Sequence, residues 1–180
     1  MQNSSLIIRP MAPQDARAFL EVHHAAVRET AAKDHPPEVI EAWAPLPIDE
    51  AFVEKVRRNL NGDFRVVAEI GGEVIGMAVL VPSKSQVLAC YVSPAHSRKG
   101  VGSALMYAIG QEAEDRGLEH LRLSASLTAV AFYKTLGFHE RGETEHVFAS
   151  GVRTTSIKMK KALGAAGSAN HTKAHRILDE

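Results

Sequence analysis

The sequence predicts a mixed α/β domain in which one layer of about seven strands carries four or five helices packed on its faces. The clearest evidence is a hairpin pattern, because residues 64–70 and 73–81 are strand-like and flank the dipeptide Gly71-Gly72, which suits a two-residue turn. A second observation is that apolar residues recur at helical spacing before residue 60 and again after residue 100. The length of 180 residues and the apolar content of 45% fit one domain with its own core.

The first third of the chain predicts one strand followed by three helices. The strand ends at Pro10, since proline cannot donate to a β-ladder. The first helix is broken at Pro36 and Pro37, because the residue before a proline is pushed out of the α region. The predicted elements are a strand at 5–9 and helices at 15–33, 37–43 and 48–59.

After the hairpin, strands and helices alternate. A largely apolar strand feeds a glycine-containing loop, and the helix after that loop ends at Gly117, where a glycine commonly terminates a helix. The predicted elements are strands at 86–92, 118–125, 138–148 and 152–161 and helices at 101–117 and 128–136. Residues 164–180 lack periodicity and predict a flexible tail, which leaves residues 1–163 as the domain.

Composition excludes several classes of partner. Lys plus Arg equals Asp plus Glu at 21 each, so no overall field attracts nucleic acid or an anionic membrane surface. The N-terminal apolar run covers only residues 6–8, and no stretch approaches the roughly 18 apolar residues of a spanning helix. A single cysteine, Cys90, cannot form an intramolecular disulfide. We therefore expect a cytoplasmic protein with no nucleic-acid or membrane partner.

The segment 92–117 predicts a local anion site. Arg98 and Lys99 precede Gly100 and Gly102, and a helix follows directly, so the free N–H groups and the positive end of its dipole would face the loop. Glycines before a helix are most often a simple turn, and a basic pair is most often solvated surface. The order of residues matches neither a P-loop, in which the lysine follows the glycines, nor the G-x-G-x-x-G loop of dinucleotide-binding proteins.

Two motifs in the predicted order of elements resemble the GNAT superfamily of acetyl-CoA-dependent N-acetyltransferases. YVSPAHSRKGVGSAL, from Tyr91, resembles the pyrophosphate-binding motif of that family, and FYKTLGF, from Phe132, resembles its fourth-helix signature. The resemblance covers roughly residues 7–161. It implies a mostly antiparallel GNAT-like sheet, acetyl-CoA as the acetyl donor and no metal. It also implies an acceptor amine, on a small molecule or a peptide, that attacks acetyl-CoA directly in a ternary complex.

The resemblance also implies roles for particular residues. Tyr133 occupies the position of the general acid that protonates the leaving thiolate. Ser97 replaces the first residue of the loop motif, and Ser126 stands where many members carry an asparagine. The residues expected to contact acetyl-CoA are Cys90, Tyr91, Val92, Arg98, Lys99, Gly100, Val101, Gly102, Ser103 and Ser126.

The general base stays open at this point. The strand lacks the carboxylate that some members place near Leu88, and the candidates are Glu29, Asp34, His35 or a water relayed to Glu69. The missing carboxylate also admits a different class of function, a non-catalytic sensor that binds acyl-CoA. The sequence leaves the identity of the amine open, and it allows a homodimer without requiring one.

Overall fold

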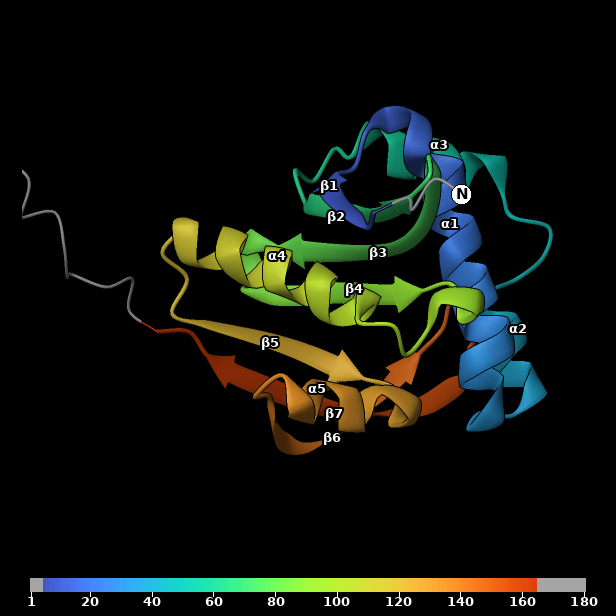
Figure 1. Cartoon of the computed structure of the whole chain (residues 1–180). Helices are drawn as coiled ribbons and strands as arrows, with labels where there is room; N and C mark the ends of the chain where they lie inside the picture. Colours follow the sequence, from blue (N-terminus) through green and yellow to red (C-terminus); the bar gives the residue numbers. More distant parts are fainter. Residues whose placement is uncertain (1–4, 165–180) are drawn as a thin grey trace, which may run out of the picture.

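A computed structural model describes residues 5–164 of the chain. All seven strands form one sheet in the order β1-β2-β3-β4-β5-β7-β6 (Figure 1), which confirms the predicted mixed, mostly antiparallel sheet. The predicted tail lies outside the described residues except for Gly164. The strands are β1 (Ile7–Pro10), β2 (Phe64–Ile70), β3 (Glu73–Val81), β4 (Gln86–Val92), β5 (His120–Ala125), β6 (His139–Val147) and β7 (Arg153–Ala162).

The helices follow the predicted order, with two differences at the N-terminus. They are α1 (Ala16–Ala25), α2 (Pro37–Trp43), α3 (Glu50–Arg58), α4 (Val101–Asp115) and α5 (Val130–Thr135). The helix predicted at 15–33 changes type after α1, into a π-helical turn η2 (Ala26–Thr30) and a 3₁₀ turn η3 (Ala31–Lys33). Pro10 belongs to β1 instead of following it, because an edge strand tolerates a residue without an N–H group.

Helices cover both faces of the sheet, and β3 contributes side chains to both cores. Ile75 packs in the core beneath α4 together with Leu105, whereas Met77 packs in the opposite core with Phe19 of α1 and Val53 of α3. Figure 1 shows α4 lying across β3 and β4, while α5 lies over β6 and β7. Successive side chains of a strand point to opposite faces, so a strand covered on both sides is apolar throughout.

The middle of the sheet is split. β4 and β5 are parallel and are paired only at Gln86 and Arg122, next to a bond from the Arg122 N–H to the Ser85 carbonyl of 2.9 Å. The Arg122 side chain adds a bond from Nε to the Lys84 carbonyl of 2.8 Å. Beyond this point the two strands separate toward their C-terminal ends, as Figure 1 shows. One edge of β4 therefore lacks a strand partner over most of its length.

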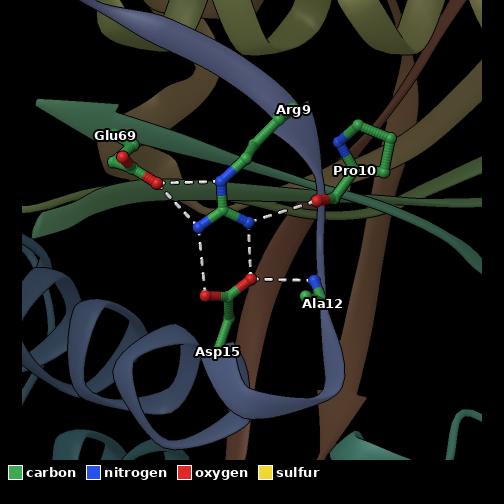
Figure 2. Close-up of polar contacts among 5 residues, drawn as sticks. All are labelled: Arg9, Pro10, Ala12, Asp15 and Glu69. Atoms are coloured by element: carbon green, nitrogen blue, oxygen red, sulfur yellow. Dashed lines mark hydrogen bonds and ion pairs between the residues drawn. The ribbon is translucent and has the colours of Figure 1, made fainter. Parts of the chain in front are cut away.

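An arginine on β1 ties the start of α1 to the sheet (Figure 2). Arg9 donates to Asp15, with Nη1 2.7 Å from Oδ2, and to Glu69 on β2, with Nε 2.8 Å from Oε2. Asp15 also accepts a 2.8 Å bond from the Ala12 N–H. The hydrogen bonds from Arg9 are the main reason why the pKa of Asp15 is lowered. Both carboxylates are thus committed to positioning the first helix.

α4 approaches β3 so closely that one strand position admits only glycine. A Cβ atom at Gly76 would lie 3.0 Å from Leu105 Cδ1, 3.1 Å from Val101 Cγ1 and 3.2 Å from the Ala68 Cβ. All three neighbours are buried in the same core, so none can move aside freely. Gly76 therefore sets the height of the N-terminal half of α4 above the sheet.

Gly76→Ala should lower the free energy of unfolding by about 1–3 kcal/mol, because the added methyl overpacks a closed core. Gly110→Ala is the matched control, since a Cβ at this α4 position meets nothing within 4 Å. It should raise stability by about 0.5–1 kcal/mol through helix propensity. Urea unfolding of the two variants measures both effects, and equal shifts in the same direction would show that the close approach is unimportant.

Candidate functional site

A cavity of about 640 Å³ lies where β4 and β5 separate. Its volume is in the range of sites that enclose small ligands. The cavity reaches from the loop before α4 to the turns after α1, so its two ends are formed by segments that are far apart in sequence. Its lining residues are Ala26, Thr30, Ala31, Trp43, Cys90, Tyr91, Val92, Ser97, Arg98, Gly100, Gly102, Ser103, Ser126, Thr128, Ala129, Ala131, Phe132 and Thr135.

One end of the cavity is the N-terminus of α4. The first intrahelical bond runs from the Ala104 N–H to the Gly100 carbonyl at 3.0 Å, and no side chain caps the helix. The N–H groups of Val101, Gly102 and Ser103 consequently precede any intrahelical acceptor. Gly100 has φ +83°, a left-handed conformation that glycine adopts without strain. The loop predicted from the sequence is therefore shaped as an anion site.

The side chains of this loop divide into two groups. Ser97 Oγ donates to the Pro94 carbonyl at 2.9 Å, and Lys99 Nζ donates to the Ala95 carbonyl at 2.9 Å, so both stabilise the turn η5 (Pro94–His96). Arg98 lines the cavity, and no hydrogen bond or ion pair engages its side chain within residues 5–164. Of the predicted basic pair, Arg98 is therefore the cation that faces the cavity.

Gly102 packs against α5, a contact that the sequence alone did not reveal. A Cβ at this position would lie 3.1 Å from Phe132 Cζ, so the glycine lets α4 and α5 approach each other. At Gly100, by contrast, a Cβ would meet nothing within 4 Å. Gly100 borders open space in the loop, whereas Gly102 mainly accommodates a neighbouring ring.

The long wall of the cavity is β4. Cys90, Tyr91 and Val92 line it, and they pair with β3 on the side away from the cavity. Because β5 leaves β4 after Gln86, the N–H and C=O groups of β4 that face β5 lack a strand partner and can pair with an extended ligand. Burial raises the pKa of the Cys90 thiol to about 12, so the sulfur stays protonated at neutral pH.

Tyr133 lies behind the cavity wall instead of on it. Its side chain is 7% exposed and packs in the core beneath α4 together with Cys90, while its neighbour Phe132 lines the cavity. Burial, followed by the proximity of Cys90 and Tyr91, raises the pKa of Tyr133 well above its usual range. The phenol therefore remains protonated at neutral pH.

Two hydroxyls border the cavity below α5. Ser126, predicted from the motif, lines the cavity, and its carbonyl accepts a 2.9 Å bond from the Ala129 N–H. Thr128 also lines the cavity, and its Oγ1 is buried without a hydrogen-bond partner among the described residues. Sequence reasoning missed Thr128, because a threonine beside a short helix carries no signal without the cavity around it.

The other end of the cavity is aromatic. Trp43 of α2 and Tyr91 of β4 line it, with ring centroids 6.5 Å apart. Behind them, His35 lies 5.5 Å from Trp43, Phe148 lies 6.3 Å from Trp43, and His23 lies 4.8 Å from Tyr91. Sequence reasoning did not single out Trp43, the one tryptophan of the chain.

None of the four candidate bases lines the cavity, and their surroundings differ. Glu29 and Asp34 are exposed, and Glu69 is held by Arg9. His35 is 8% exposed, its Nδ1 lies 3.2 Å from Thr154 Oγ1, and its Nε2 is buried without a partner among the described residues. Burial lowers the pKa of His35, so its ring is neutral at pH 7.

Two negative findings concern residues 5–164 alone. Every helix in that part of the chain is too short or too polar to cross a bilayer. No three side chains of the His, Cys, Asp and Glu types converge there as a metal centre would require.

Comparison with known proteins gives a consistent set of similarities. The family model for the acetyltransferase (GNAT) domain matches residues 31–163. N-acetyltransferase family 8 member 7 of Mus musculus is 33% identical over 130 residues, which is 66% of this chain and 57% of the mouse protein. The match thus spans little more than half the length of that relative.

Solved structures agree with this assignment of the fold. A GCN5-related N-acetyltransferase from Rhodopseudomonas palustris superimposes with a TM-score of 0.80 at 28% identity, over 91% of this chain and 99% of that one. A Salmonella typhimurium protein solved with its cofactor acetyl-CoA gives a TM-score of 0.68 at 24% identity, over 93% and 99% of the two chains.

Stability should fall on acidification because of His23. Burial, followed by the charge of His24, lowers the pKa of His23 to about 4. Between the ordinary histidine pKa of about 6.5 and pH 4, His23 is protonated in the unfolded chain and neutral in the folded chain. The free energy of unfolding therefore falls by up to about 3 kcal/mol as the pH decreases over this range. Urea unfolding at pH 7 and pH 4.5 should show a smaller loss for His23→Phe than for the wild type. Parallel losses would assign the acid sensitivity to other groups.

Proposed function

The chain belongs to the acetyltransferase (GNAT) family, and from this membership we propose that it transfers the acetyl group of acetyl-CoA to the amine of an acceptor. One observation carries the proposal: a single cavity joins an anion-binding helix terminus, an unpaired strand edge and an aromatic pocket. We assign the activity to a domain of residues 1–163. The cytoplasmic location, the absence of nucleic-acid and membrane partners and the option of a homodimer stay predictions.

The proposed donor site follows the shape of the cavity. The pyrophosphate would accept hydrogen bonds from the free N–H groups at the start of α4, with Arg98 as its cation and open space at Gly100. The pantetheine arm would pair with the edge of β4 at Cys90, Tyr91 and Val92. The Salmonella typhimurium relative, which holds acetyl-CoA, supports this choice of donor.

The reaction needs three contributions from the protein. An alkyl amine with a pKa of about 10.4 has fewer than about one molecule in a thousand neutral at pH 7, so its proton must be removed. When the amine nitrogen bonds to the acetyl carbon, the carbonyl oxygen gains charge that an unpaired N–H group of β4 can stabilise. The carbon–sulfur bond then breaks, and the leaving thiolate takes a proton. Tyr133 is the proposed donor of that proton.

His35 is the proposed base among the four candidates. Its neutral ring lies against Trp43, and a water bridging its unpaired Nε2 to the cavity would carry the proton of the amine. Glu69 is a weaker candidate because a hydrogen bond and an ion pair with Arg9 occupy its Oε2. An acyl-cysteine route through Cys90 is disfavoured, because a thiol with a pKa of about 12 is a poor nucleophile.

Gly100→Ala should weaken binding of acetyl-CoA at least tenfold, because its methyl would occupy the space proposed for the phosphates. Gly117→Ala is the matched control: it too places a methyl in open space at positive φ, +71°, but at the far end of α4. Both variants should lose a similar amount of stability from backbone strain. Calorimetric titration with acetyl-CoA separates them, and equal affinities would refute the assigned phosphate site.

Tyr133→Phe should lower kcat about 10²-fold and leave acetyl-CoA affinity unchanged, since the phenol would act on the leaving thiolate. This is the lower end of the usual range for a general acid, because a raised pKa makes the phenol a weak one. Tyr107→Phe, the same change on a side chain that is 70% exposed, should have no effect. Unaltered turnover in Tyr133→Phe, with chemistry rate-limiting, would reduce Tyr133 to a packing residue.

The pH profile distinguishes the two proposed groups. In the wild type, kcat should fall below pH 6.5 as His35 takes a proton, because its pKa is lowered from that ordinary value. His35→Gln should lower kcat and remove this acidic limb, whereas Tyr133→Phe should keep it. An acidic limb that survives in His35→Gln would assign the base to another group.

A further inference from the structure

The cavity is poor in charge, and this restricts the acceptor. Arg98 is the one charged side chain among its lining residues within 5–164, and it lies at the loop end. No carboxylate of residues 5–164 is among the lining residues. Glu69 and Asp15 are held by Arg9, and Glu29 and Asp34 are exposed. A buried ammonium without an anionic partner is strongly unfavourable. The site therefore does not suit an acceptor with several positive charges.

The aromatic end of the cavity offers a different kind of contact. Trp43 and Tyr91 present rings to the cavity, and His35, His23 and Phe148 support them from behind. The support is edge-to-face or tilted, which fixes ring orientation. Apolar side chains extend this wall: Ala26 and Ala31 come from the turns after α1. A flat apolar group can pack against these rings.

An attraction between a ligand cation and these rings does not change this conclusion. The face of a tryptophan attracts an ammonium, but the gain is smaller than the cost of removing water from an unpaired charge. The reacting nitrogen must in addition lose its proton before it can attack. Further charges on the acceptor would find no carboxylate among the cavity-lining residues within 5–164.

From these observations, and resting on the proposed function, we propose that the acceptor is a primary amine carried on an aromatic or similarly apolar group, which packs against Trp43 and Tyr91. Polyamines and aminoglycosides are excluded as preferred substrates. Trp43 is then a specificity-determining residue. Its contribution should depend on the apolar part of the acceptor and should not affect the binding of acetyl-CoA.

The test compares amines of similar basicity on the full chain, with release of CoA thiol as the readout. We expect kcat/KM for 2-phenylethylamine and tryptamine to exceed that for spermidine and kanamycin at least tenfold. Among alkyl amines, each added methylene should raise kcat/KM up to about fourfold as it becomes buried. A preference for spermidine or kanamycin would overturn the proposal.

Variants of Trp43 assign the effect to the aromatic wall. Trp43→Ala should lower kcat/KM for 2-phenylethylamine at least tenfold, mainly through KM, and leave acetyl-CoA affinity by calorimetry unchanged. Trp43→Phe retains a ring and should recover most of this loss. It keeps the test valid if Trp43→Ala fails to fold. Tyr107→Ala, at an exposed position on α4, should resemble the wild type. Equal losses for 2-phenylethylamine and ethylamine in Trp43→Ala would also overturn the proposal.

Acetylation of the amine panel, measured separately from binding of acetyl-CoA, distinguishes failure of the proposed acceptor class from failure of the proposed function. A preference for spermidine or kanamycin over the aromatic amines would overturn the acceptor class alone. Acetyl-CoA that binds without acetylation of any amine in the panel, or that fails to bind a folded chain, would overturn the proposed function on which that class rests.

Discussion

The parting of β4 and β5 is the constraint from which the site follows. Parallel neighbours normally pair along their length, and here they do so at Gln86 and Arg122 only. The unpaired edge of β4 would be costly if it were buried dry, because backbone polar groups require partners. The opening leaves that edge accessible to a ligand, and the N-terminus of α4 faces the same space. The strand edge and the helix terminus thus offer hydrogen bonds to one ligand.

The surrounding packing holds the opening in place. Gly76 lets α4 lie close to β3, and Gly102 lets Phe132 approach the first turn of α4. On the opposite face, Arg9 anchors the segment before α1 through Asp15 and Glu69 (Figure 2). The same network occupies both carboxylates, so neither is free to act elsewhere.

Local patterns predicted the fold well, and they predicted the site in part. The hairpin around Gly71-Gly72 and the strand before the loop have the predicted bounds, because alternation and turn chemistry are properties of neighbouring residues. The helical type after α1 differs, since a π turn depends on tertiary packing. Which cation faces the cavity, Arg98 or Lys99, depends on a side-chain bond to a carbonyl that no motif encodes. The place of Tyr133 behind Phe132 likewise needs the packed core.

The aromatic end of the cavity is closed by a contact between distant parts of the chain. His35 and Thr154 are 119 positions apart, and Phe148 at the end of the β6–β7 hairpin approaches Trp43. A nascent chain emerging from the ribosome exposes the loop at Arg98 and the whole of α4 well before it exposes Thr154. The half of the cavity at the N-terminus of α4 can thus form before the last hairpin is synthesised, whereas the aromatic half requires that hairpin. The order of translation itself therefore separates the two halves of the site in time.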